Sequence, residues 1–257
     1  MENIFLAFLL TLIAGLSTLI GSFITFVFKK ENKSFLSLSL GFSAGVMIYI
    51  SMIEMLNSSK ELLTSSLEGK TGDYVSIIAF FSGMLLILLI NRCIPEDLEQ
   101  KKSKEGKNSL MRTGTVTALV IGIHNFPEGL ATFISALKEP MVALPLVIAI
   151  AIHNIPEGIA VSAPIYRASG SKKKAFLFCM LSGIAEPLGA LIGYAILMPF
   201  VNDLVFGIVY ALVAGIMVFI SFDELLPSAN GEEKSSASIY GLILGMLIMA
   251  VSLVLLK

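Results

Sequence analysis

The sequence predicts an all-α polytopic membrane protein with eight transmembrane helices in an inverted-repeat arrangement, and three observations lead to this fold class. Hydrophobic residues make up 56% of the chain and charged residues only 14%, and the mean hydropathy of +0.87 lies far outside the range of soluble globular domains. The apolar residues gather in continuous runs of about 20, the length that crosses a bilayer as a helix. The beginning and the end of the chain also resemble each other in sequence.

Eight apolar runs are the predicted spans. In chain order they cover residues 4–28, 35–57, 74–94, 113–137, 141–166, 174–198, 204–227 and 238–256. Continuous apolar runs differ from the alternating pattern of a membrane β-barrel, so that architecture is excluded. The connections are short, so residues 1–257 are predicted to form one transmembrane transporter domain with a mixed-charge cytoplasmic linker at about 95–112. The first run lacks a positively charged flank and is too long for a signal peptide, so we expect it to stay in the mature protein.

The distribution of basic residues predicts the orientation of these spans. The loops between spans 1 and 2, 3 and 4, 5 and 6, and 7 and 8, together with Arg92 and Lys174 at the adjoining span ends, carry 14 of the 18 Lys and Arg residues. Because basic loops stay in the cytoplasm, both termini are predicted to face outward, which requires an even number of spans. We expect a multi-pass protein of the cell inner (plasma) membrane.

The clearest internal repeat links span 2 to span 7 at an offset of 170 residues. The matching residues are Ala44–Met47 with Ala214–Met217, Ser51 with Ser221, and Glu54 with Glu224. Weaker matches, for which chance similarity of glycine-rich helices is the alternative, are those of Gly15, Gly21 and Gly83 with Gly183, Gly189 and Gly245. Matched spans are an odd number of helices apart and therefore cross the bilayer in opposite directions. This is the inverted-repeat plan of secondary transporters, with spans 4 and 5 as a central pair.

A His-Asn-x-Pro-Glu-Gly phrase occurs twice, near the middle of spans 4 and 5, and it contains both histidines of the chain. The histidine and glutamate of each phrase are four residues apart and share one helix face, which the asparagine also reaches. The potential metal ligands are His124, Asn125, Glu128, His153, Asn154 and Glu157. Ionisable groups at this depth cost about 2.5–3.5 kcal/mol each on insertion scales, so they indicate function. The alternative for each histidine is a core side chain bonded to a neighbouring carbonyl.

Three further features add to this predicted midplane metal site. Pro127 and Pro156 each remove a backbone donor, so we expect a kinked helix and a freed carbonyl beside the ligands. Glu186 is a third carboxylate in the middle of span 6, for which a structural hydrogen bond between helices is the alternative. Together with Glu128 and Glu157 it gives three negative charges, so one divalent ion would leave a charge of −1 and two would leave +1.

Acidic residues are also predicted at both openings of a metal pathway. Glu54 lies near the outer end of span 2, and Asp223 and Glu224 lie near the cytoplasmic end of span 7. The residues that share a helix face with these carboxylates are Met47 and Ser51 in span 2 and Met217 and Ser221 in span 7. Acidic groups at the openings would attract cations. The alternatives are interfacial caps for the acidic residues and simple packing for the methionines.

The paired phrases, the eight spans and the outward termini resemble the ZIP (Zrt/Irt-like) family of metal transporters over essentially the whole chain. The resemblance implies uptake of divalent metal into the cytoplasm through a 3+2+3 helix arrangement, often with a two-metal centre. It implies that a first metal is held by His124, Glu128, His153 and Glu157. It implies that a second metal is held by Asn125, Glu128, Asn154, Glu157 and Glu186, with the two shared glutamates as bridges. Many relatives carry a histidine-rich segment between spans 3 and 4, and its absence here puts metal handover by that loop in doubt.

Zinc (Zn²⁺) is the expected transported substrate, and the resemblance extends the range to iron, manganese and cobalt. Imidazole, amide and carboxylate ligands do not separate Zn²⁺ from Fe²⁺, Mn²⁺, Co²⁺ or Cd²⁺, whereas the lack of thiolate ligands argues against copper(I). The alternative function is an intramembrane zinc-dependent hydrolase, but the His-Glu-x-x-His phrase that favours such an enzyme is absent. A transporter rather than an enzyme is therefore predicted. The expected partners are divalent metal ions and membrane lipid, with a homodimer as an option, and nothing indicates nucleic acid.

Overall fold

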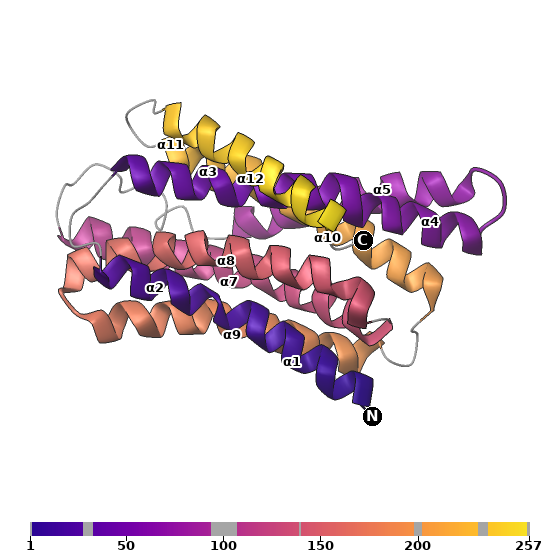
Figure 1. Ribbon diagram of the computed structural model, residues 1–257, viewed down its shortest axis with the longest axis horizontal. Helices are drawn as coiled ribbons and strands as arrows, with labels where there is room; N and C mark the ends of the chain where they lie inside the picture. Colours follow the sequence, from indigo (N-terminus) through magenta and orange to yellow (C-terminus); the bar gives the residue numbers. More distant parts are fainter. Residues whose placement is uncertain are drawn as a thin grey trace.

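The computed structural model describes residues 2–27, 33–93, 107–138, 140–197, 202–230 and 236–255, and these ranges are helical apart from short turns (Figure 1). The helices of the first half are α1 (Glu2–Leu16), α2 (Thr18–Val27), α3 (Lys33–Ile50), the π-helical turn η1 (Ser51–Met55), α4 (Leu56–Ser66) and α5 (Thr71–Cys93). Those of the second half are α7 (Lys107–Lys138), α8 (Pro140–Ser169), α9 (Lys172–Leu197), α10 (Asp203–Ile220), the π-helical turn η3 (Ser221–Leu225), α11 (Leu226–Asn230) and α12 (Ser236–Leu255).

These helices occupy all eight predicted spans. By length and hydropathy, seven stretches of the described chain can cross a membrane, namely Ile4–Val27, Ser34–Ser66, Thr71–Ile90, Ala143–Ser169, Lys172–Ile196, Asp203–Asn230 and Ser236–Leu255. The remaining predicted span lies within α7, a helix of 32 residues. Large apolar side chains on the outside of the bundle, such as Tyr240 and Leu247, would face lipid hydrocarbon. The predicted all-α polytopic fold is confirmed.

The helices pack as two groups that run along the long axis of the molecule (Figure 1). Helices α1, α2, α7, α8 and α9 contact one another and form the first group. In the second group α3 packs along α12 and α5 packs along α10, with α4 between α5 and α10. The two groups meet mainly where α3 lies against α8. Both ends of the chain lie in the right half of Figure 1, whereas α2 and α8 end at the left, so successive spans alternate in direction.

Close glycine contacts confirm the inverted repeat within the second group. A Cβ atom added to Gly45 of α3 would strike the carbonyl of Leu242, and one added to Gly215 of α10 would strike the carbonyl of Phe80. In the same way, Gly245 faces the carbonyl of Phe42 and Gly83 faces that of Leu212. Each contact maps onto its counterpart by an offset of 170 residues between spans 2 and 7 and of 162 between spans 3 and 8. The weak match of Gly83 with Gly245 is thus a true structural repeat.

The same symmetry relates spans 1 and 6 and the central pair. Gly15 and Gly183 face each other's carbonyl groups, so the pseudo-two-fold axis passes between them. The other pairs of counterparts are Gly21 against Ile155 with Gly189 against Phe126, and Gly158 against Thr18 with Gly129 against Glu186. Small residues of this kind allow helix backbones to approach closely in a membrane, where the hydrophobic effect does not drive helix association. The glycine of each repeated phrase therefore sets how near span 1 or span 6 comes to the site.

Backbone irregularities occur at places that the sequence did not indicate. Helices α7 and α8 are continuous through Pro127 and Pro156, and the expected kinks and freed carbonyls stay predictions. Span 1 is instead divided at Ser17, whose hydroxyl group donates to the carbonyl of Ala14 at 2.6 Å. The other irregularities are the two π-helical turns, η1 and η3, which start at the matched residues Ser51 and Ser221. Short π-helical segments inside α-helices are rare and often mark functional sites.

Replacing Gly45 with alanine is predicted to destabilise the fold, because the new methyl group would overlap the Leu242 carbonyl. Overpacking of this kind typically costs about 1–3 kcal/mol. Gly122→Ala is the matched control, since its Cβ would meet only the Cα of Ser182 at an ordinary 3.9 Å. Thermal unfolding of the purified proteins in detergent is the measurement. Equal melting temperatures for the two variants would contradict the assigned α3–α12 contact.

Candidate metal centre

Helices α7, α8 and α9 bring the predicted ligands together in the middle of the first helix group. Asn125, Glu128, His153, Asn154, Glu157 and Glu186 are all at most 1% exposed. The side chain of His124 lies outside the described part of the structure, although its backbone belongs to α7. Six polar side chains are therefore removed from solvent in a region where each unsatisfied group is costly.

A histidine–glutamate pair joins the two repeated phrases. His153 Nε2 lies 3.3 Å from Glu128 Oε2, and both side chains are buried. The other ring nitrogen, Nδ1, lies 3.1 Å from the carbonyl oxygen of Ala149 in the preceding turn of α8. A carbonyl at Nδ1 favours the tautomer that carries its proton there, which leaves Nε2 as the nitrogen that can bind a metal. The imidazole is thus oriented toward the glutamate of the other phrase.

The two asparagines are held in place by symmetry-related backbone carbonyls. Asn154 Nδ2 donates to the carbonyl of Ala14 at 3.0 Å, and Asn125 Nδ2 donates to that of Ser182 at 3.2 Å. Ala14 and Ser182 are counterparts in spans 1 and 6, separated by the same 168 residues as Gly15 and Gly183. Each amide nitrogen is occupied by a carbonyl, so the amide oxygen is the atom left to act as a ligand.

Glu186 and Thr18 occupy equivalent positions but differ in chemistry. Glu186 Oε1 accepts a hydrogen bond from Asn154 Nδ2, so it lies beside the second phrase. Gly129 packs on the backbone of Glu186 in the same way as Gly158 packs on that of Thr18. Thr18 is fully buried, and its hydroxyl oxygen has no hydrogen-bond partner among the described residues. The site therefore carries a carboxylate on the span 6 side and a neutral hydroxyl on the span 1 side.

Buried oxygen atoms without hydrogen-bond partners among the described residues concentrate at this site. They include Asn125 Oδ1, Asn154 Oδ1, Glu128 Oε1 and Glu186 Oε2. Buried acceptors are normally satisfied, and a cluster of exceptions calls for a ligand or a water. Within the described chain no three His, Cys, Asp or Glu side chains form a group that could hold a metal ion. They meet as the pair His153–Glu128, and Glu186 is paired with the amide of Asn154.

The predicted pathway residues of span 2 adjoin this centre on one side. Ser43 Oγ donates to the carbonyl of His153 at 3.3 Å, which fixes the face of α3 that looks toward α8. Met47 lies one turn further along that helix and is fully buried in the main apolar cluster, as is Met217 of α10. Their placement agrees with the packing alternative for both methionines.

The acidic residues that were predicted at two openings lie at the π-helical turns. Glu54 in η1 and Glu224 in η3 are partly buried, whereas Asp223 is exposed. Ser51 and Ser221 are fully buried at the starts of these turns. A π-helical turn places residues five apart above one another, so the α-helical spacing used to put Ser51 and Glu54 on one face does not hold through η1.

The region around Glu54 has two features that the sequence did not reveal. Tyr210 of α10 lies near Ser135 of α7 and within electrostatic reach of Glu54. Lys138, at the end of α7, forms an ion pair of 2.7 Å with Asp203 at the start of α10. Both contacts cross between the two helix groups. Sequence spacing could not find them, because they join residues of spans 4 and 7 that share no motif.

Comparison with known proteins gives one consistent family. The family model described as ZIP Zinc transporter matches residues 92–253. Curated relatives named Zinc transporter ZupT include one from Streptococcus mutans, which is 58% identical over 99% of this chain and 98% of its own length. The relatives from Clostridium perfringens and Oceanobacillus iheyensis are 55% and 54% identical, and each alignment covers at least 97% of both chains. The similarity therefore extends over all eight spans.

Glu186→Gln is predicted to raise the thermal stability of the metal-free protein. Burial of a carboxyl group beside two others costs free energy at neutral pH, whether it stays charged or takes up a proton. Glutamine keeps an oxygen that can accept from Asn154 and removes that cost. We expect a gain of about 0.5–2 kcal/mol, which is common when a strained functional site is relieved. Thermal unfolding in the presence of a chelator measures it, and a clear loss of stability would instead indicate a structural role for Glu186.

Proposed function

Because this chain belongs to the ZIP family of zinc transporters, we propose that it carries divalent metal cations, zinc above all, into the cytoplasm. Membership of a transporter family confirms the prediction of a transporter rather than an intramembrane hydrolase. The observation that carries the proposal for this chain is the cluster of buried, partly unsatisfied ligand atoms on the pseudo-two-fold axis. A site on such an axis can open to either side of the membrane with the same ligands.

The proposed first metal site combines the histidines and glutamates of both phrases. Its ligands are His124, Glu128, His153 and Glu157. Support comes from His153, whose Nε2 already points at Glu128 while its Nδ1 is held by a backbone carbonyl. A metal ion between the two side chains would replace their mutual contact with one bond to the imidazole nitrogen and one bond to the carboxylate oxygen. Nitrogen and oxygen ligands of this kind suit zinc and also iron, manganese, cobalt and cadmium.

The proposed second site uses the amide oxygens and the additional carboxylate. Its ligands are Asn125, Asn154 and Glu186, together with Glu128 and Glu157 as bridges to the first site. The anchored amide nitrogens support this assignment, because both unoccupied amide oxygens then belong to the same pseudo-symmetric arrangement. Three carboxylates carry a charge of −3, which one divalent ion reduces to −1 and a second raises to +1. The net charge of the centre is therefore only one unit from zero, whether it holds one divalent ion or two.

We propose that both termini face the outside of the plasma membrane, as the distribution of basic residues predicts. Glu54 then lies at the outer opening, while Asp223 and Glu224 lie at the cytoplasmic one. The partial burial of Glu54, within electrostatic reach of the buried Tyr210, supports a position at the seam between the two helix groups rather than on the lipid face. A cation entering along this seam would meet the acidic group before it reaches His153. Dimer formation with a second copy remains a prediction from the sequence.

Replacing either central histidine is predicted to abolish most zinc uptake. His153→Ala removes the only described imidazole from the site, and His124→Ala removes its counterpart in the first phrase. We expect a loss of at least about tenfold, because loss of one inner ligand weakens metal binding strongly. The measurement is zinc uptake into proteoliposomes at equal protein content, with iron, manganese, cobalt, cadmium and magnesium run in parallel. Unchanged zinc flux in both variants would overturn the proposal, and Lys70→Ala, at an exposed turn, is the control.

Neutralising the acidic residues of the openings is predicted to act on affinity rather than on maximal rate. Glu54→Gln should reduce uptake several-fold at metal concentrations well below saturation, because local enrichment of cations is lost. At saturating metal the rates should converge with that of the unchanged protein. Glu224→Gln tests the opposite opening in the same way, by efflux from preloaded vesicles. A reduction that is equal at all concentrations would mark these residues as structural.

A further inference from the structure

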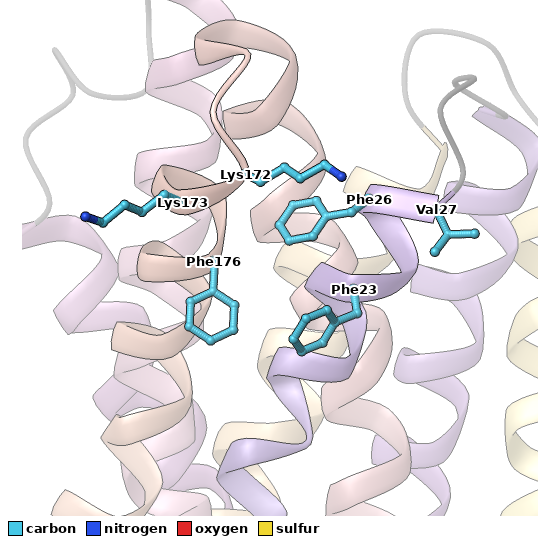
Figure 2. A pocket seen from close by; sticks show the side chains of 6 residues that line it. All are labelled: Phe23, Phe26, Val27, Lys172, Lys173 and Phe176. Carbon is cyan, nitrogen blue, oxygen red and sulfur yellow. The ribbon is translucent and has the colours of Figure 1, made fainter.

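The groove between the end of α2 and the start of α9 combines two kinds of side chain in separate layers (Figure 2). It has a volume of about 530 Å³ and is lined by Phe23, Phe26, Val27, Lys172, Lys173 and Phe176. The two lysines extend from one end of the groove with their ammonium groups pointing in opposite directions, and the rings of Phe23 and Phe176 lie deeper along the helices (Figure 2). Among the residues that the structure describes, no acidic side chain lines it. The groove lies at the end of the bundle opposite the chain termini, away from the metal centre.

The aromatic floor of the groove is prearranged. The ring centroids of Phe23 and Phe176 are 5.8 Å apart in an edge-to-face arrangement that joins α2 to α9. Phe26 packs against Tyr166 of α8 at 5.5 Å, and the ammonium group of Lys172 lies 5.6 Å from the centre of the Phe26 ring. Phe23 is nevertheless 57% exposed, so its ring presents an apolar surface to whatever fills the groove. Such rings adjoin acyl chains readily at the edge of a bilayer.

We propose that this groove binds one anionic phospholipid of the cytoplasmic leaflet. The phosphate group would lie at the lysine end of the groove, where the exposed, flexible side chains of Lys172 and Lys173 would turn toward it, and the first part of an acyl chain would cover Phe23 and Phe176. Charge complementarity selects this occupant, because the basic ends of the spans face the leaflet that holds anionic lipids. A volume of about 530 Å³ falls within the range of small-molecule pockets, enough for a glycerophosphate group with the upper part of its chain.

A bound lipid at this position would join α2 to α9, two helices of the group that holds the metal centre. Both helices adjoin the site directly, because Thr18 begins α2 and Glu186 lies in α9. Anionic lipid would therefore stabilise the first helix group as a unit and leave the contacts with α3 and α10 unchanged. This role is separate from metal binding, since none of the lining residues is a proposed ligand.

Native mass spectrometry of the purified protein in detergent tests the proposal, with dioleoylphosphatidylglycerol and dioleoylphosphatidylcholine as probes. We expect the unchanged protein to bind one molecule of the glycerol lipid more tightly than the choline lipid. The variant K172Q/K173Q should weaken binding of the glycerol lipid roughly thirtyfold, from about 1 kcal/mol for each lysine near an anionic surface. Binding of phosphatidylcholine should stay unchanged in that variant.

The matched control is K70Q/K174Q, which removes two exposed lysines without altering the groove lining. It should bind phosphatidylglycerol like the unchanged protein, and an equal loss there would mean diffuse charge attraction and overturn the proposal. Glycerol phosphate in tenfold excess should not displace the lipid, and displacement would identify an anion site instead. Equal binding of both lipids by the unchanged protein would also overturn it. Transport is not measured, so these outcomes are independent of the proposed metal uptake.

Discussion

The burial of three carboxyl groups is the constraint on which the rest of this structure depends. Glu128, Glu157 and Glu186 are at most 1% exposed, and such groups are stable only where protein atoms or bound cations replace water. The surrounding helices meet this need with polar groups of their own. An imidazole faces Glu128, and an asparagine amide faces Glu186. The glycines of the two phrases let spans 1 and 6 approach this region closely, because Gly158 packs on the backbone of Thr18 and Gly129 on that of Glu186.

The pseudo-two-fold symmetry explains the framework of the site, and its one departure gives the two halves different chemistry. Both asparagines donate to equivalent carbonyls, and both motif glycines pack on equivalent backbone. The symmetry fails at one pair of equivalent positions, where span 6 has Glu186 and span 1 has Thr18. A fully symmetric site with a second carboxylate in place of Thr18 would carry a charge of −4 and would hold two divalent ions at neutrality. The threonine leaves a net positive charge at full occupancy, which favours release.

Much of the site could be predicted from sequence because its ligands lie in two repeated phrases with helical spacing. The eight spans, the buried positions of Asn125 and Asn154, and the repeat of spans 2 and 7 all followed from such local patterns. The break at Ser17 and the π-helical turns did not, because each depends on contacts with other helices. Ser17 follows Gly15 in an apolar run, and only the amide of Asn154 shows why the Ala14 carbonyl must be accessible. Tyr210 and Ser135 likewise belong to distant spans without a shared motif.

The distribution of hydrogen bonds indicates which parts of the molecule move together. Those that orient the proposed ligands, from Asn125 to Ser182 and from Asn154 to Ala14, stay within the first helix group. Between the groups, α3 and α8 share one long hydrogen bond from Ser43 and an apolar cluster that includes Met47 and Ile150. Apolar contacts such as those between α3 and α8 are not directional, so they tolerate a change of position better than hydrogen bonds do. A break in the hydrogen bonds of Asn125 and Asn154 would instead leave buried polar atoms without partners. The described hydrogen bonds therefore hold the proposed ligands within the first helix group, and the ion pair of Lys138 with Asp203 is a polar link from this group to α10.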